Sequence, residues 1–385
     1  MPTAAPPPSA ARGAVGHTTT LAERKRRAGQ RLVIGLAGPS LDNEQRSFFR
    51  EVQPAGFIHF ARNIESAEQI AELNRELVDL SPDDRPPLLS IDQEGGRVQR
   101  LKDTPWPSMR ALGNLADLPT TTQVAAAMAD ELRATGFNLN FAPVCDVDSN
   151  PKNPVIGDRS FGKRPAEVAA QAVAFLEGLH SHGVIGCAKH FPGHGDTSVD
   201  SHLALPVVDK ELGELREVEL PPFAAMVKAG VAMVMTSHVL FPDLDRDLPA
   251  TLSEKVLKRL LRDELGYNGV VISDDLEMKA VRGRWAVPEL VELATRATVD
   301  LFCVGRSFEH DLTLSGALFE ALVRSQEADN ALDRAALDAT RRLWALRLRF
   351  LRSPSPPPDR AVVGGPAFRA LAAFVRARGA EAGLS

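Results

Sequence analysis

The segment from Lys189 to His202 gathers side chains that can do chemistry. It reads KHFPGHGDTSVDSH and holds three histidines, two aspartates and one lysine within fourteen residues. Pro192, Gly193 and Gly195 favour a loop over a continued helix or strand. Loops of this length without regular structure are usually functional. We therefore take this segment as the first candidate for a functional site.

Two kinds of chemistry fit this loop. The first is binding of zinc or another divalent ion, for which the loop offers suitable ligand types: His190, His194, Asp196, Asp200 and His202. The second is acid–base catalysis by Asp200-Ser201-His202. On a curved loop, Asp200 can bond one ring nitrogen of His202 and leave the other nitrogen for a substrate. This arrangement fixes the tautomer and keeps the pKa of the imidazole near neutral.

A second pair of acidic residues ends the apolar run GVVISD, where Asp275 follows Asp274 directly. Adjacent side chains point in opposite directions in an extended chain, so only one of the two faces a common cavity. We assign that position to Asp274. Asp275 is expected to act as a helix cap or to support its neighbour.

The elements that must position these residues alternate along the chain. Short apolar segments, typical of parallel strands covered on both faces, occupy 31–37, 56–61, 87–92, 137–144, 184–191, 231–239, 269–274 and 299–305. Between them, helical periodicity occupies 67–80, 122–136, 165–183 and 253–266. Thr121 and Ser253 are predicted N-caps, and glycines at 136, 183 and 266 are predicted to end helices.

Eight such β-then-α units predict an α/β protein with one closed (β/α)8 TIM-type barrel. The main alternative, a doubly wound open sheet, is disfavoured because no glycine-rich dinucleotide fingerprint follows the first strand. In a barrel, the carboxyl ends of the strands carry the active site. Asp92, Arg100, Arg159 and Lys189 all follow or end predicted strands. Together they predict a polar pocket that suits a neutral polyol such as a sugar.

Composition narrows the class of partner and the compartment. The net charge of −5 shows no basic excess of the kind that nucleic-acid binders carry. The cysteines at 145, 187 and 303 are widely spaced and odd in number, so we expect reduced core thiols and no disulfide. Neither a secretory apolar stretch nor a run of about 18 apolar residues occurs. These features predict a cytoplasmic protein that spans no membrane.

The ends of the chain differ in composition from the middle. We expect a flexible N-terminal tail over 1–27, a catalytic barrel over 28–351, and a proline-rich linker and tail over 352–385. Within the last segment, 366–378 has the pattern of a short amphipathic helix whose partner the sequence does not indicate. We expect the chain to be a monomer.

Four stretches together resemble one family. KHFPGHGDTSVDSH, IDQEGGRVQRL, GDRSFG and VVISDDLEM are similar to motifs of glycoside hydrolase family 3. The first is long and highly specific, and the other three are moderately specific. They look most like the single-domain bacterial β-N-acetylglucosaminidases of cell-wall recycling. The resemblance runs from about Leu32 to the region after Val304.

The resemblance implies a role for each matching residue. Asp274 takes the position of the nucleophile, His202 that of the general acid/base, and Asp200 that of its orienting partner. The substrate-binding positions are matched by Asp92, Arg100, Arg159, Lys189 and His190. No metal and no cofactor is implied. The implied reaction is a retaining double displacement on a carbohydrate with terminal N-acetylglucosamine, such as a muropeptide.

Alternatives to this function stay open at the level of sequence. The histidines and aspartates of the 189–202 loop could serve a metal-dependent hydrolase on the same barrel. A sugar-binding protein without catalysis is a further possibility. A glycoside phosphorylase is another, because a neutral histidine base repels an anionic phosphate acceptor less than a carboxylate does.

Overall fold

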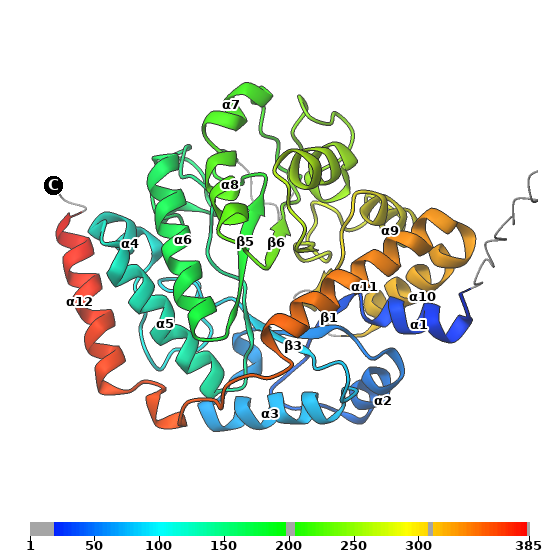
Figure 1. Ribbon diagram of the computed structural model, residues 1–385, viewed down its shortest axis with the longest axis horizontal. Helices are drawn as coiled ribbons and strands as arrows, with labels where there is room; N and C mark the ends of the chain where they lie inside the picture. Colours follow the sequence, from blue (N-terminus) through cyan, green and yellow to red (C-terminus); the bar gives the residue numbers. More distant parts are fainter. Residues whose placement is uncertain (1–18, 198–204, 307–310, 383–385) are drawn as a thin grey trace, which may run out of the picture.

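Eight parallel strands form the centre of the computed structural model, which describes residues 19–197, 205–306 and 311–382 (Figure 1). The strands are β1 (Leu32–Gly35), β2 (Gly56–His59), β3 (Leu88–Ile91), β4 (Leu139–Asn140), β5 (Ile185–Phe191), β6 (Met233–Thr236), β7 (Val270–Ile272) and β8 (Phe302–Val304). Each lies inside the range predicted for it, and most are a few residues shorter.

The strands close on themselves. Their order is β7-β6-β5-β4-β3-β2-β1-β8, and every neighbouring pair is parallel. A parallel bridge between Ile272 and Leu301 joins β7 to the start of β8. There the N–H of Leu301 donates to the carbonyl of Val271 at 3.0 Å, and that of Ser273 donates to the carbonyl of Leu301 at 2.9 Å. The barrel prediction is therefore confirmed, and the open sheet is excluded.

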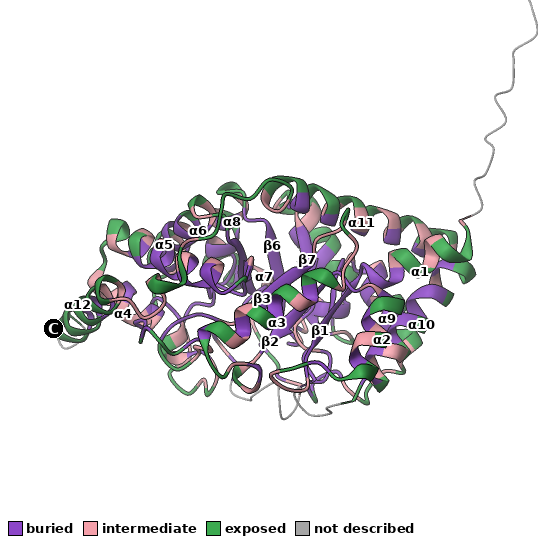
Figure 2. Ribbon diagram, turned by 90° about the horizontal axis from the view of Figure 1, so that it is seen from below, coloured by how far each residue is buried: buried purple, intermediate pink, exposed green. Residues whose placement is uncertain are grey.

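The strands are buried on both faces, which explains their continuous apolar sequence (Figure 2). In β1, Val33 belongs to the cluster that fills the barrel, whereas Leu32 and Ile34 belong to the cluster between the strands and the surrounding helices. Leu343 and Leu346 of α11 (Asn330–Phe350) pack against the inner cluster. All three cysteines are buried and free, as expected.

Helices surround the barrel. Those before β5 are α1 (Leu21–Gly29), α2 (Asn43–Val52), α3 (Ala67–Asp79), α4 (Met109–Leu115), α5 (Leu118–Ala134) and α6 (Pro165–Ser181). Those after it are α7 (Leu212–Glu217), α8 (Leu220–Lys228), α9 (Val287–Arg296), α10 (Thr313–Ala328), α11 and α12 (Pro366–Ala382). Short 3-10 turns are η1 (Ala61–Asn63), η2 (Gly157–Arg159), η3 (Ala250–Leu252) and η5 (Arg360–Val362), and η4 (Lys255–Glu264) is a π-helix.

The predicted helix ends are mostly confirmed. The glycines at 136, 183 and 266 adopt φ values of 88°, 77° and 70°, the left-handed conformation that ends a helix. The hydroxyl of Ser253 accepts from the N–H of Val256 at 3.3 Å, as a cap does. The prediction for Thr121 was wrong. The helix begins three residues earlier, where the Asp117 carboxylate caps it by accepting from the N–H of Thr120 at 3.2 Å.

Both end segments are more ordered than the composition predicts. Within the expected 1–27 tail, Leu21–Gly29 forms α1, which packs against α10 and α11. Within the expected C-terminal tail, α12 packs against α4 and α5 (Figure 1). The helix predicted over 366–378 is therefore confirmed, and α4 and α5 are its partners. In the expected N-terminal tail, residues 21–27 belong to α1. Among the helices of the described part of the chain, none has the length and apolarity to span a membrane.

Candidate active site

A polar cavity of about 210 Å³ opens at the carboxyl ends of the barrel strands. Six of the eight predicted site residues line it: Asp92, Arg100, Arg159, Lys189, His190 and Asp274. They come from β5 and from the segments that follow β3, β4 and β7, so residues up to 182 positions apart meet in one place. The remaining two, Asp200 and His202, lie outside the described residues.

A network of buried charges forms one side of this cavity. The Lys189 ammonium, whose side chain is 2% exposed, lies 2.8 Å from the Asp92 carboxylate and 2.6 Å from that of Glu94. Arg159 donates two hydrogen bonds of 2.8 Å to the two oxygens of Glu94. Arg100 approaches Asp92 at 3.3 Å. Every charge in the network therefore has an opposite partner, as burial requires.

These pairings set the protonation states. Burial alone would raise the pKa of Glu94, but Arg159 and Lys189 outweigh it and lower that pKa to about 2. The pKa of Asp92 is likewise lowered, because Lys189 and Arg100 outweigh its desolvation. Burial would lower the pKa of Lys189, but the two carboxylates raise it. At neutral pH the network is therefore fully ionised.

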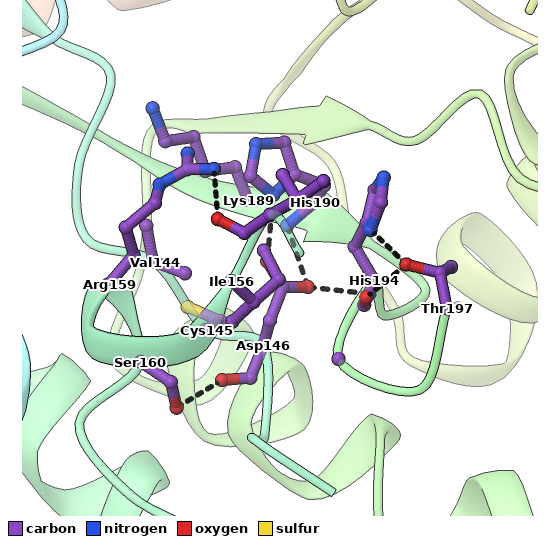
Figure 3. A network of polar contacts seen from close by, with 12 residues as sticks. Val144, Cys145, Asp146, Ile156, Arg159, Ser160, Lys189, His190, His194 and Thr197 are labelled. Atoms are coloured by element: carbon purple, nitrogen blue, oxygen red, sulfur yellow. Dashed lines mark hydrogen bonds and ion pairs between the residues drawn. The ribbon is translucent and has the colours of Figure 1, made fainter. Parts of the chain in front are cut away.

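A buried carboxylate positions the histidines of β5 and its loop (Figure 3). Asp146, in the segment after β4, accepts from the Nδ1 of His190 at 2.7 Å and from the backbone N–H groups of His190 and His194 at 3.2 and 2.7 Å. Because Nδ1 of His190 faces this carboxylate, Nδ1 carries a proton, and Nε2 is left for a ligand. The Asp146 pKa is lowered because His190 outweighs the desolvation of the carboxyl group.

Two neighbouring aspartates follow β7, and they have different roles. Asp274 lines the cavity, and one of its oxygens accepts from the N–H of Asp275 at 2.8 Å. The Oδ1 atom of Asp275 accepts from the N–H groups of Glu277 and Gly305 at 3.0 and 2.9 Å. His238, at the end of β6, contacts the Asp275 carbonyl through Nε2 at 3.1 Å. Asp275 therefore fixes the backbone beside Asp274. Both aspartates line the cavity, so the expectation that only one of them faces it was wrong.

Burial also distinguishes Asp275. Desolvation raises the pKa of this carboxyl group to about 6, although the two backbone N–H groups act in the opposite direction.

The loop between β3 and α4 gives Arg100 its place. Gly95 and Gly96 adopt φ values of 91° and 56°, and a Cβ on Gly95 would lie 2.1 Å from the carbonyl oxygen of Pro107. Only glycine fits such a position. The buried Gln93 side chain accepts from the N–H groups of Arg100 and Leu101 at 2.9 and 3.1 Å. The backbone at Arg100 is thus held by its own loop.

Described residues on either side of the segment that carries Asp200 and His202 contact each other. The Lys210 ammonium lies 3.4 Å from the Asp196 carboxylate and 2.6 Å from that of Glu219. The Glu219 side chain is 1% exposed. Before the segment, the Asn153 amide donates to the carbonyls of His194 and Gly195 at 2.8 and 3.0 Å. The described residues that precede and follow the 198–204 stretch are therefore held in place by contacts of their own.

Sequence reasoning missed two residues of the site. Glu94 holds Lys189 and Arg159, and Asp146 holds His190. A signal existed for Glu94, which stands two positions after Asp92 in a strand-end segment rich in polar residues. The sequence signal for Asp146 is weaker, because its segment VCDVD resembles the continuation of a buried strand.

The metal-binding reading of the 189–202 loop gains no geometric support from its described residues. His190 and His194 are oriented by Asp146 and by the Thr197 hydroxyl, the latter 2.9 Å from the Nδ1 of His194. Among the described residues, no group of three or more His, Cys, Asp or Glu side chains is arranged to hold an ion.

The closed barrel and the carboxylate-lined cavity at its carboxyl end are the framework of a glycoside hydrolase. A family model described as the glycosyl hydrolase family 3 N-terminal domain matches residues 26–337. The chain belongs to this family.

Curated relatives agree with the family. A beta-hexosaminidase of Nitrosomonas eutropha is 37% identical over 282 residues, which cover 71% of this chain and 80% of the relative. A beta-hexosaminidase of Xylella fastidiosa is 40% identical over 281 residues, covering 71% and 82%.

Solved structures extend the similarity to the fold. A glycoside hydrolase family 3 β-N-acetylglucosaminidase from Paenibacillus sp. FPU-7 superposes with a TM-score of 0.84 at 37% identity, covering 92% of this chain and 68% of that one. NagZ from Neisseria gonorrhoeae, in complex with N-trifluoroacetyl-D-glucosamine, superposes with a TM-score of 0.73 at 32% identity, covering 91% and 98%.

Proposed function

We propose that this family 3 hydrolase is a retaining exo-β-N-acetylglucosaminidase. It removes terminal, non-reducing N-acetylglucosamine from muropeptides during peptidoglycan recycling in the cytoplasm, and it acts as a monomer without metal or cofactor. The names of the relatives support the sugar specificity. The observation that carries the proposal is the convergence of Asp274 with Asp92, Arg100, Arg159, Lys189 and His190 on one cavity.

The cavity walls suit a neutral sugar. The Asp92 carboxylate accepts from hydroxyl groups, whereas Lys189 and Arg100 donate to them. The Nε2 atom of His190 offers one more hydrogen-bonding group. Since the pairing of these groups already balances their charges, a ligand with many hydroxyl groups and no charge can bind without leaving a buried ion unpaired.

The reaction follows from the two roles that the family resemblance gives to Asp274 and His202. Asp274 attacks the anomeric carbon while His202, oriented by Asp200, gives its proton to the leaving oxygen. The bond to the aglycone breaks and a glycosyl-aspartate forms. Neutral His202 then takes a proton from water, and the hydroxide oxygen displaces Asp274 from the sugar. The configuration at the anomeric carbon is retained after two inversions.

The test uses the reactivity of the leaving group. The His202→Ala variant should lose about 10²–10⁴-fold in rate on a disaccharide, which needs protonation of its leaving oxygen. On an aryl glycoside with an acidic phenol, the loss in the first step should be much smaller. Equal losses on both substrates would contradict the acid role. A fluorosugar that accumulates the intermediate should label Asp274, and mass spectrometry of the digested enzyme should locate it.

Further measurements of sugar release separate the three alternatives. A metal-dependent hydrolase would lose activity after dialysis against a chelator, whereas the proposed enzyme keeps its rate. A phosphorylase would release N-acetylglucosamine 1-phosphate when phosphate is added, and the proposed hydrolase releases free sugar. No release of sugar from any β-N-acetylglucosaminide would overturn the proposed function itself.

A further inference from the structure

A groove of about 650 Å³ lies beside the active site, between the β3–α4 loop and the C-terminal helix α12. One wall carries Arg97, Lys102 and Arg110, and the other carries Arg376. The second wall follows the residues that the family model matches, which end at 337. This groove therefore depends on a part of the chain that the proposed function does not use.

Helix α12 is firmly seated against its neighbours. The rings of Trp106 and Phe368 lie 5.9 Å apart. The N–H of Gly364, just before the helix, donates to the buried Glu131 carboxylate at 2.8 Å. Near the end of the helix, a Cβ on Gly379 would lie 2.4 Å from the carbonyl oxygen of Ala111 in α4, so the two backbones are in close contact. The groove therefore has two fixed walls.

The groove and the catalytic cavity share one rim. Along the β3–α4 loop, Glu94, Val98 and Arg100 line the cavity, whereas Arg97 and Gln99 line the groove. After β4, Arg159 lines the cavity and the preceding residue, Asp158, lines the groove. Consecutive Cα atoms are about 3.8 Å apart. Only one segment of backbone therefore separates the two sites, and a substrate whose sugar fills the cavity can extend over it into the groove.

The charge of the groove is positive. Arg97 is paired with Asp158 at 2.7 Å. Arg110 is paired with Asp148 at 2.8 Å. Lys102 and Arg376 are exposed, and neither forms an ion pair with any residue in the described part of the chain.

The groove is also lined by the exposed apolar residues Pro105 and Ala380. A groove with a free cation on each wall and apolar surface beside them suits an acidic peptide better than a compact anion such as phosphate.

We propose that this groove binds an acidic peptide carried by the aglycone, with Lys102 and Arg376 contacting its carboxylates. The inference rests on the proposed function, because it concerns the part of the substrate that remains after the terminal sugar is released. It assigns a specificity role to α12. An enzyme with this groove prefers aglycones that carry free carboxylates over aglycones that lack them.

The experiment compares three substrates with the same terminal sugar. They are an aryl β-N-acetylglucosaminide, a disaccharide-peptide with free acidic side chains, and the same disaccharide-peptide with its carboxyl groups amidated. The variant is Lys102→Ala combined with Arg376→Ala. The matched control is Arg378→Ala, on the same helix, exposed, paired with Glu381 and absent from the groove lining.

The double variant should raise KM for the acidic substrate by about three- to thirty-fold, the range expected for two exposed ion pairs. It should leave kcat/KM unchanged for the aryl and amidated substrates. In the unmodified enzyme, added salt should reduce the preference for the acidic over the amidated substrate, since exposed charges are screened.

Three results would overturn the inference. The first is that the unmodified enzyme has the same KM for the acidic and the amidated substrate. The second is that the double variant leaves KM for the acidic substrate unchanged. The third is that Arg378→Ala changes this KM as much as the double variant does. The proposed function fails separately, because its failure is the absence of cleavage of the aryl glycoside by the unmodified enzyme.

Discussion

Glu94 offers the sharpest test of how the site is held together. The carboxylate is 1% exposed and contacts both Arg159 and Lys189, so it balances two cations at once. The Glu94→Gln substitution keeps the shape of the side chain and removes its charge. The amide also places a donor where one of the two cations now donates. We expect a large loss of stability and a loss of sugar binding from this single change.

The magnitude follows from two independent estimates. A pKa of about 2, against the ordinary value of 4.5, corresponds to roughly 3 kcal/mol of stabilisation of the ionised group, at 1.36 kcal/mol per pKa unit. Removing one partner of a buried ion pair typically costs about 3–5 kcal/mol, because the other charge stays buried without compensation. We therefore expect Glu94→Gln to lower the free energy of unfolding by about 3–5 kcal/mol.

Urea unfolding measures this loss, and the exposed pair Arg97–Asp158 supplies the control. Both side chains of that pair are close to half exposed, so Asp158→Asn should cost less than about 1 kcal/mol. The pH dependence adds a second check. Since folding lowers the pKa of Glu94, its contribution is complete above the unfolded pKa and is lost as the pH falls toward about 2. The difference between the two proteins should therefore shrink below about pH 4.

Equal losses from Glu94→Gln and Asp158→Asn would refute this reasoning. So would a difference between unmodified protein and Glu94→Gln that stays constant as the pH is lowered through the acid range.

Two further predictions concern the flanks of the site. Lys210→Met removes the cation that joins Asp196 to Glu219, and it should slow hydrolysis of disaccharides more than of activated aryl glycosides. The loss should be smaller than the ~10²–10⁴-fold contribution of general acid–base catalysis, and Lys210→Arg should restore the rate. A uniform loss on all substrates would contradict a role in positioning His202. For Asp275, folding raises the pKa of the carboxyl group to about 6. The folded protein therefore loses stability as the pH rises from about 4 to about 6, because it must then either keep a proton that the unfolded chain has released or ionise a buried group. Asp275→Asn should remove this slope, so that by urea unfolding the unmodified protein becomes roughly 3 kcal/mol less stable relative to the variant between these pH values. An unchanged difference would show that the carboxyl group is ionised throughout.

The barrel could be predicted from sequence because its signal is local and repeated. Each strand is short, apolar and buried on both faces, and this combination leaves a continuous apolar run that is easy to recognise. The exact strand ends could not be predicted. In β4 only Leu139–Asn140 pair as a regular strand within the 137–144 run. The backbone beyond it is irregular but stays bonded to β5, through the bridge between Val144 and Lys189, and it leads to Asp146, which contacts His190.

The site was predictable where its residues stand at strand ends, and less so where they act through another residue. Asp92, Lys189 and Asp274 follow the rule that polar side chains at the carboxyl edge face the barrel mouth. Glu94 contacts the cations Lys189 and Arg159, and Asp146 contacts His190. These contacts join segments that are 44 or more positions apart in the sequence. The packing partners of α12 could not be predicted for the same reason, since α4 and α5 are remote from it in sequence.

The acidic groups of the site differ in what surrounds them, and this difference supports the proposal that Asp274 is the nucleophile. Asp92 and Glu94 are engaged by cations and Asp146 by a histidine, so their lone pairs serve to hold other residues. Asp275 is directed toward backbone N–H groups, and burial keeps its pKa near 6. A neighbour that is partly protonated near neutral pH places less negative charge beside Asp274 than a fully ionised one would. The attacking carboxylate must be ionised when it approaches a carbon that is becoming positive. A second negative charge close by would make it harder to keep this carboxylate ionised. If Asp275 serves this purpose, then Asp275→Asn should preserve glycosylation of Asp274 by a fluorosugar, whereas Asp274→Asn should abolish it.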